Sequence, residues 1–279
     1  MSAVEVRGLR KRYGGFEAVR GIDFSIEAGE VFGLLGPNGA GKTTTVEILE
    51  GYRTRDEGTV TVLGTDPQHA DRDWREQVGV VLQSSSLYPS LTVKESLSVF
   101  AGYYRSPRDP GEVIEIVGLT DKRDARVRTL SGGQKRRLDL GLALVGDPEL
   151  IFLDEPTTGF DPGARRSAWE TIRNLRSLGK TVLLTTHYLD EAEQLADRVA
   201  VLRDGVIVRE GTPAELTGGS AETEIRYRRD GETIVERTAE PTRRLHELTE
   251  AALADGGELD GLEVRRPTLE DVYLELTGE

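Results

Sequence analysis

Short apolar runs alternate with longer amphipathic stretches along most of this chain. Val31–Leu35, Leu150–Leu153 and Val182–Leu184 are almost wholly apolar, which is typical of strands that are covered on both faces. Val4–Leu9 and Ile22–Ile26 instead alternate apolar and polar residues, as half-buried strands do. Strands that alternate with helices predict an α/β fold with a largely parallel sheet.

The middle of the chain has a different pattern. Strand signals fade over residues of about 87–146, where Leu91–Tyr104, Gly111–Val117 and Gly132–Val145 have helical periodicity. We therefore expect a helical subdomain inserted there. After it, the strand-like runs resume, and Asp204–Gly205 between two of them predicts a β-hairpin.

A second, smaller domain is predicted at the C-terminal end. Thr217–Ser220 reads as a linker, which divides the chain into domains over 1–216 and 221–279. Asp230–Gly231 predicts a second hairpin, and helices are expected at about Thr242–Ala254 and Thr268–Leu276. With a strand at about Leu262–Arg265, these elements form an α+β appendage.

Composition narrows the possible functions. The chain has 279 residues and a net charge of −13, which makes it a poor general binder of DNA, RNA or anionic lipid. It contains no cysteine, so disulfides and thiolate metal sites are excluded. No apolar run approaches the roughly 20 residues that span a bilayer, and the N-terminus has no secretory signal pattern.

A phosphate-binding loop follows the strand Val31–Leu35. The motif G-x-x-x-x-G-K-[ST] is formed by Gly36, Pro37, Asn38, Gly39, Ala40, Gly41, Lys42 and Thr43. A helix is expected immediately afterwards, over Thr44–Leu49, and this context supports the motif. Glycines let backbone N–H groups surround an anion, Lys42 can reach the β- and γ-phosphates, and the Thr43 hydroxyl can hold Mg²⁺. The motif alone predicts a nucleoside triphosphate without choosing among kinase, GTPase and motor.

Two carboxylates follow the apolar run Leu150–Leu153. Asp154 and Glu155 end this predicted strand, where ligands of parallel sheets bind. Asp154 suits a Mg²⁺ position, and Glu155 suits the group that polarises an attacking water. The alternative is a surface turn with two solvated acids, which the upstream phosphate loop makes less plausible.

A second anion site is predicted about 90 residues after the first. Ser131 stands at the N-cap of the helix from Gly132, and Gly132 and Gly133 expose its first N–H groups. Gln134 follows them. One nucleotide does not need two such cradles unless both surround it or two chains share it.

With these motifs in order, residues of about 4–215 resemble the nucleotide-binding subunit of an ATP-binding-cassette (ABC) transporter. The resemblance implies a P-loop NTPase fold with a mixed sheet, an antiparallel β subdomain and the inserted helical subdomain. It also implies that Ser131–Gln134 close on ATP held by the phosphate loop of a second copy, so that two ATP molecules lie in a head-to-tail homodimer. We call Ser131–Gln134 the signature loop.

The same resemblance assigns further residues. Tyr13 matches the aromatic that stacks on adenine, and Thr44 joins the phosphate loop in contacting the nucleotide. Gln83 matches the glutamine that contacts Mg²⁺ and the attacking water, and Asp161 matches the residue that touches the opposite site. His187 matches the histidine that binds the γ-phosphate and orients Glu155, although a lone histidine after a strand is more often structural.

The resemblance implies an ATPase that uses ATP and Mg²⁺ and drives a separate integral-membrane subunit. It would be cytoplasmic and peripheral on the inner face of the membrane, with no nucleic acid expected. The contact is expected at the loop of residues 83–91, where Leu87, Tyr88 and Leu91 supply apolar surface or are simply subdomain core.

The whole chain also resembles daunorubicin-resistance-type drug-export cassettes, most closely at 157–162, 186–193 and 267–277. This likeness implies export of a drug-like or hydrophobic compound. The alternatives are an importer cassette, a non-transport ABC ATPase acting on ribosomes or DNA, and a cassette that binds ATP without hydrolysing it. The presence of Lys42, Asp154, Glu155 and His187 argues against the last.

Overall fold

The computed structural model describes residues 2–81, 87–217, 223–229, 231–254, 256–265, 268–271 and 273. These fall into two compact units, Met1–Glu210 and Gly211–Glu279. The division lies a few residues before the linker expected at Thr217–Ser220, of which only Thr217 is among the described residues. Each unit is described by itself.

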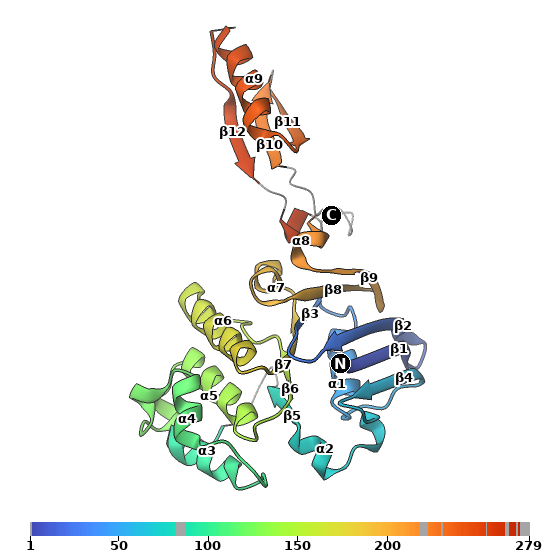
Figure 1. Ribbon diagram of the computed structural model, residues 1–279, viewed down its shortest axis with the longest axis vertical. Helices are drawn as coiled ribbons and strands as arrows, with labels where there is room; N and C mark the ends of the chain where they lie inside the picture. The colour runs from blue at the N-terminus through green and yellow to red at the C-terminus, as the bar shows by residue number, and fades with distance from the viewer. Residues whose placement is uncertain are drawn as a thin grey trace. The chain divides into compact units, whose positions relative to one another are not determined.

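A six-stranded sheet forms the centre of the first unit (Figure 1). Its strands, in spatial order, are β5 (Val78–Val81), β6 (Leu150–Asp154), β7 (Thr181–Thr186), β3 (Val31–Leu35), β8 (Arg198–Arg203) and β9 (Val206–Gly211). Parallel ladders join the first five strands, as the near-continuous apolar runs predict. Strands β8 and β9 are neighbours on either side of Asp204–Gly205, and both turn residues have positive φ.

A second, antiparallel sheet has the strand order β2–β1–β4. Its strands are β1 (Ser2–Tyr13), β2 (Phe16–Glu27) and β4 (Glu57–Val62). All three alternate buried and exposed residues over much of their length, because only one face meets the core. Together with α1 (Lys42–Leu49), this sheet covers one face of the six-stranded sheet, where Phe32, Phe152 and Leu183 are fully buried.

Helices cover the opposite face of the six-stranded sheet. The residues of β5, β6 and β7 that point this way, among them Val81, Ile151 and Leu184, share one core with these helices. The helices are α3 (Val93–Ala101), α4 (Pro110–Ile116), α5 (Gly132–Leu144) and α6 (Pro162–Ser177). The unit also contains α2 (Arg72–Glu76), whose Trp74 belongs to the core beneath the antiparallel sheet, and α7 (Leu189–Leu195). Short 3₁₀ helices lie at Pro67–His69, Thr120–Lys122 and Val127–Thr129.

Local capping explains where the observed helices differ from the expected ranges. The helix expected at Leu91–Tyr104 begins only at Val93, because Thr92 and Glu95 form a capping box, and it ends before Gly102. The helix expected at Gly111–Val117 begins one residue earlier, since Asp109 caps it and Pro110 suits its first position. Strand β5 is described from Val78 to Val81, and residues 82–86, which include Gln83, lie outside the described residues.

The second unit contains a three-stranded antiparallel sheet in the order β11–β10–β12. Its elements are α8 (Pro213–Leu216), β10 (Thr223–Arg229), β11 (Glu232–Thr238), α9 (Pro241–Ala254) and β12 (Asp260–Arg265). The hairpin, helix and strand predicted from sequence are thus observed. The helix predicted at Thr268–Leu276 lies mostly outside the described residues. Among the helices of the described residues, none is long and apolar enough to cross a membrane.

Candidate nucleotide site

The phosphate loop Gly36–Thr43 runs from the end of β3 into the first turn of α1, in the strand–helix setting that its sequence predicts. Gly41 has φ 105° and stands at the N-cap of α1 without any side-chain cap, so the first turn of the helix keeps its N–H groups for an anion. A Cβ on Gly41 would lie 2.5 Å from the Ala18 carbonyl oxygen, and one on Gly36 would lie 2.2 Å from that of Leu202. Both positions therefore require glycine.

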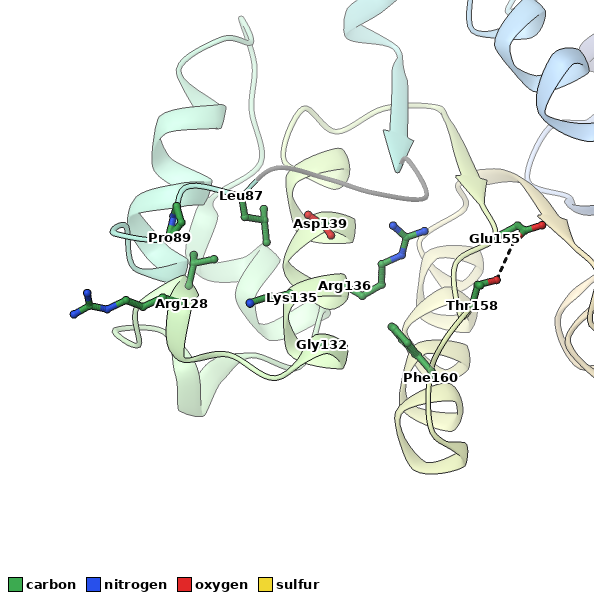
Figure 2. A pocket seen from close by; sticks show the side chains of 11 residues that line it. Leu87, Pro89, Arg128, Gly132, Lys135, Arg136, Asp139, Glu155, Thr158 and Phe160 are labelled. Carbon is green, nitrogen blue, oxygen red and sulfur yellow. Dashed lines mark hydrogen bonds between the residues drawn. The ribbon is translucent and has the colours of Figure 1, made fainter.

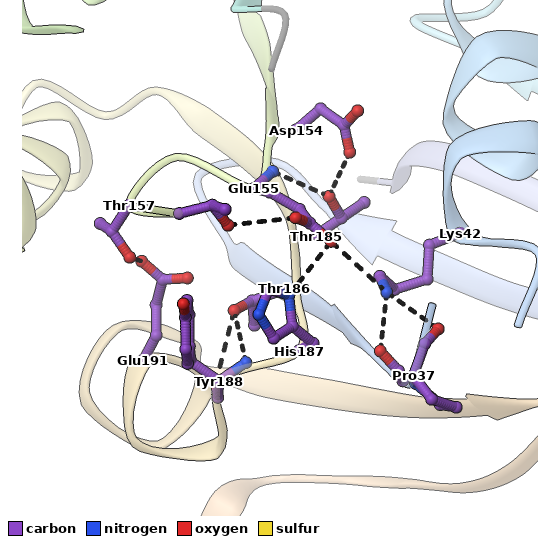
Figure 3. Close-up of polar contacts among 12 residues, drawn as sticks. Pro37, Lys42, Asp154, Glu155, Thr157, Thr185, Thr186, His187, Tyr188 and Glu191 are labelled. Carbon is purple, nitrogen blue, oxygen red and sulfur yellow. Dashed lines mark hydrogen bonds and ion pairs between the residues drawn. The ribbon is translucent and has the colours of Figure 1, made fainter. Parts of the chain in front are cut away.

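Lys42 lies inside this loop and is only 5% exposed. Its Nζ donates hydrogen bonds to the carbonyl oxygens of Gly36 (2.6 Å) and Pro37 (3.1 Å), and it lies 3.7 Å from Glu155 Oε1 (Figure 3). Burial lowers the pKa of the Lys42 ammonium, while the Glu155 and Asp154 carboxylates oppose that shift. The cation is thus held at the point where the loop would surround a phosphate.

The carboxylates Asp154 and Glu155 lie at the end of β6, beside β7. The Thr185 hydroxyl on β7 donates to Asp154 Oδ1 (2.5 Å) and accepts from the backbone N–H of Glu155 (3.1 Å). Glu155 has φ 44°, a left-handed conformation that is uncommon for a residue with a side chain. Such conformations gather at functional sites.

Three side chains converge on the Glu155 carboxylate. His187 Nδ1 lies 3.2 Å from Oε1, the Thr158 hydroxyl donates to Oε2 (3.0 Å), and Lys42 Nζ completes the group. The resemblance implied that His187 orients Glu155, and the structure brings these two side chains together. Thr158 and Thr185 were not predicted. A threonine in a buried strand or beside a turn has no sequence signal that separates it from an ordinary structural residue.

A hollow of about 210 Å³ opens over the phosphate loop. Its lining residues are Tyr13, Phe16, Ala18, Asn38, Gly39, Gly41, Lys42, Thr43, Thr44 and Glu155. Tyr13, 40% exposed, is flanked by Lys11 Nζ and the Arg53 guanidinium at 5.7 Å and 5.3 Å from its ring centroid. The hollow therefore offers an aromatic face at one end and the phosphate cradle at the other.

The signature loop begins helix α5, as expected from its sequence. Ser131 is the N-cap, and Ser131 and Gln134 form a reciprocal capping box. None of the four described residues Ser131–Gln134 lines the hollow over the phosphate loop. Gly132 instead lines a second cleft of about 460 Å³, whose wall also includes Arg128, Lys135, Arg136, Thr158 and Phe160 (Figure 2). Glu155 lines both this cleft and the hollow over the phosphate loop. Within one chain, the two predicted anion cradles thus line different cavities, which have Glu155 in common.

Arg136 connects the helix of the signature loop to the carboxylate strand. It is partly buried, and its guanidinium donates to the backbone carbonyl oxygens of Asp154 (2.9 Å) and Pro156 (3.2 Å). Arg136 was not among the residues predicted for the site. A run of basic residues at a helix start is usually a solvated face, so its buried member could not be recognised there.

The remaining predicted residues are those expected to contact the second copy, Mg²⁺ or the membrane subunit. Asp161 caps α6 by accepting hydrogen bonds from the N–H groups of Gly163 and Ala164, and these bonds lower the pKa of its carboxyl. Gln83 lies outside the described residues. Of the expected apolar contacts for a membrane partner, Leu87 packs against the core, whereas Tyr88 is 59% exposed.

The oxygen donors at the site fit Mg²⁺. Thr43 is exposed at the start of α1, and Asp154 is only partly buried at the end of β6. Among the described residues, no group of three or more histidine, aspartate or glutamate side chains could hold a metal by itself. Mg²⁺ in nucleotide enzymes needs only one or two protein oxygens, because phosphates and water supply the rest.

Comparison with known proteins agrees with this geometry. The family model described as "ABC transporter" matches residues 19–158. The chain is similar to "Nod factor export ATP-binding protein I" of Rhizobium sp. (strain N33), at 42% identity over 301 residues, covering 99% of this chain and 97% of that protein.

Solved structures agree as well. The chain is similar to cbiO1 from Clostridium perfringens, described as part of the ABC transporter complex cbiONQ (TM-score 0.71, 28% identity, 77% and 90% of the two chains). It is also similar to an ATP-binding cassette in a dimeric post-hydrolysis state bound to ADP and Pi (TM-score 0.65, 26% identity, 75% and 98%). The fold predicted from the sequence is confirmed by these likenesses.

Proposed function

Since this chain belongs to the ABC transporter family, as an ATP-binding subunit that hydrolyses ATP, we propose that two copies of it enclose two ATP molecules and drive an integral-membrane subunit made by another chain. Each ATP would lie on the phosphate loop of one copy and be closed by the signature loop of the other. The similar dimeric cassette bound to ADP and Pi supports this arrangement. It is also supported by the lining of the phosphate-loop hollow, which includes none of the described residues Ser131–Gln134.

The proposal gives each predicted residue a role. Tyr13 stacks on adenine, and Lys42 and the N–H groups of the phosphate loop bind the phosphates. Thr43 and Asp154, with Gln83, hold Mg²⁺, which shields phosphate charge when bound. Asp161 and the signature loop act on the nucleotide of the partner copy. In this scheme 1–216 is the nucleotide-binding domain, with its helical subdomain at about 87–146, and 221–279 is an appendage.

The observation that carries the proposal is the setting of the Glu155 carboxylate. It lies beside Lys42 at the end of β6, with His187 and Thr158 fixing its two oxygens. A water between this carboxylate and the γ-phosphorus would be oriented for attack, and its proton would pass to Glu155. The bond from the γ-phosphorus to the bridging oxygen would break as the water oxygen bonds, which releases ADP and phosphate. Phosphoryl transfer needs mainly positioning and charge neutralisation, which Lys42 and the N-terminus of α1 supply.

We further propose that the transported compound leaves the cell. The similar proteins are named for Nod factor export, and the whole-chain likeness to daunorubicin-resistance-type cassettes points to a drug-like or hydrophobic compound. The cassette would then be peripheral on the inner face of the membrane. Co-purification with a membrane subunit, followed by flux in inverted vesicles, tests both points. ATP-dependent accumulation inside the vesicles supports export, and ATP-dependent release contradicts it.

The catalytic proposal is tested by Glu155→Gln, which keeps the shape of the side chain but removes the proton acceptor. ATP binding should stay intact, because the phosphate loop is unchanged, while kcat should fall by at least about 10²-fold. Glu170→Gln, at an exposed position on α6, is the matched control and should hydrolyse ATP normally. Phosphate release by Glu155→Gln at near the normal rate would refute the assigned role.

A further inference from the structure

One fully buried carboxylate near the site has no part in the proposed mechanism. Glu191 has 0% exposure and lies in the first turn of α7, four residues after His187. Burial raises the pKa of its carboxyl above the ordinary value. Glutamate is rarely buried unless it is hydrogen-bonded. One oxygen of Glu191, Oε1, accepts two hydrogen bonds, and the partners of this oxygen indicate what Glu191 does.

Those partners come from two other elements. Glu191 Oε1 accepts hydrogen bonds from the Thr157 hydroxyl (2.7 Å) and from the indole N–H of Trp169 (3.2 Å). Thr157 is itself fully buried, in the turn between β6 and α6, and Trp169 lies on α6. One oxygen atom therefore joins α7, α6 and the turn that follows the catalytic strand (Figure 3 shows Glu191 directed at Thr157).

The turn held by Glu191 carries the group that fixes Glu155. Thr158 follows Thr157, and its hydroxyl donates to Glu155 Oε2 (3.0 Å) while its backbone N–H bonds the Glu155 carbonyl (3.3 Å). On the other side, α7 follows His187, which bonds Glu155 Oε1. The contacts form a closed ring from Glu155 through the turn to Glu191, along α7 to His187, and back to Glu155.

A second set of contacts joins α6 to the start of α7. The Arg165 guanidinium lies 4.4 Å from the ring centroid of Tyr188 and 3.2 Å from Asp190 Oδ2. These contacts are more exposed than the Glu191 hydrogen bonds. They anchor the start of α7 to α6 but do not reach the turn of residues 156–160.

We propose that Glu191 is a positioning residue that clamps the turn 156–160 to α7, so that Thr158 and His187 hold the Glu155 carboxylate from both sides in one fixed geometry. The inference rests on the proposed roles of Glu155 and His187. It predicts that loss of the clamp reduces the chemical step while leaving nucleotide binding unchanged, because neither Glu191 nor Thr157 lines the hollow over the phosphate loop.

The experiment compares single and double variants of the full chain by steady-state ATPase assay and by binding of a fluorescent ATP analogue. Glu191→Ala and Thr157→Val each break the bond between α7 and the turn, and each should lower kcat by about 10-fold while KM and analogue Kd change less than about two-fold. Glu191→Gln keeps a carbonyl oxygen that can accept both hydrogen bonds. Its kcat should therefore be close to that of the unchanged protein and well above that of Glu191→Ala. Activities are normalised to the amount of protein that binds the analogue.

Two further variants separate positioning from general stability. Trp169→Phe is the matched control, since it removes a hydrogen bond to the same oxygen without touching the turn, and its kcat should stay within about two-fold of normal. The double variant Glu191→Ala with Thr157→Val should be no slower than the slower single variant, because both remove the same link.

The inference is overturned if Thr157→Val retains full kcat, or if the two single effects multiply in the double variant. Thr157→Val also keeps the test decisive if Glu191→Ala fails to fold. Glu155→Gln is measured alongside. If it is inactive while Glu191→Ala and Thr157→Val are fully active, only this inference fails. If Glu155→Gln is fully active, the proposed function fails with it.

Discussion

Thr185 shows how a single hydroxyl organises both carboxylates of the site. It donates to Asp154 and accepts from the Glu155 N–H, and it is itself fully buried on β7. A hydroxyl has one proton to give, so the bond to Asp154 fixes its direction and leaves its lone pairs for Glu155. The orientation of the proposed Mg²⁺ ligand and the backbone position of Glu155 are therefore coupled through one atom.

This coupling predicts the effect of Thr185→Val. Valine preserves shape and burial but leaves Asp154 without the bond that orients it, so the Mg²⁺ concentration for half-maximal ATPase activity should rise by about 10-fold or more. Thr181→Val, at the opposite end of the same strand, should leave that concentration unchanged. An unaltered Mg²⁺ dependence in Thr185→Val would contradict the account.

Residues could be predicted from the sequence where chemistry conflicted with burial. Asp154 and Glu155 were recognisable because acids directly after an apolar strand are hard to explain by packing. Thr185 and Glu191 were not recognisable, since a threonine in a strand and a glutamate in the first turn of a helix are both ordinary at those places. Their importance lies in partners about 30 residues away in sequence, which no local pattern reveals.

At the scale of elements, helix α1 links the phosphate loop to a titratable group. Its C-cap residue is Glu50, which is partly buried. Burial raises the pKa of Glu50 to about 8, and the negative charges of Asp154 and Glu47 add to the shift. Between its ordinary pKa of 4.5 and about 8, Glu50 thus keeps a proton in the folded chain that it loses in the unfolded chain.

The sign of the effect follows from this difference. Because the folded state binds more protons, Glu50 makes folding less favourable as pH rises from about 5 to about 8, by up to about 1.4 kcal/mol per pH unit. Glu50→Gln removes this dependence. Thermal unfolding is measured with EDTA and without nucleotide. The unfolding temperature of Glu50→Gln minus that of the unchanged protein should increase as pH rises over this range. A constant difference at every pH would show that Glu50 does not titrate there, and Glu170→Gln provides the control.

The type of each main element could be predicted, whereas the ends of several could not. Continuous apolar runs identified β3, β6 and β7, and Asp-Gly pairs located both hairpins. The beginnings of α3 and α4 depended on caps at Thr92 and Asp109, which hydrophobic periodicity does not register. The strand order β5–β6–β7–β3–β8 was beyond any local pattern, because neighbours in the sheet are far apart in sequence.

At the scale of the whole molecule, the main feature is that only one of the two anion cradles, the phosphate loop, lines the proposed nucleotide hollow of its own chain. The phosphate loop opens into a hollow shared with Tyr13 and Glu155, whereas the described residues Ser131–Gln134 line none of it. The capping box at Ser131 preforms its helix start without a ligand. In a head-to-tail pair, the helix start at Ser131 of one copy would contact the nucleotide that the phosphate loop of the other copy holds.

The most direct test of this claim is a crystal structure of Glu155→Gln with ATP and Mg²⁺. We predict a dimer in which the Ser131 hydroxyl of each copy lies at hydrogen-bonding distance, about 2.7–3.2 Å, from a γ-phosphate oxygen of the ATP on the other copy's phosphate loop. A nucleotide-loaded structure in which Ser131 meets no γ-phosphate, or only that of its own chain, would contradict the account.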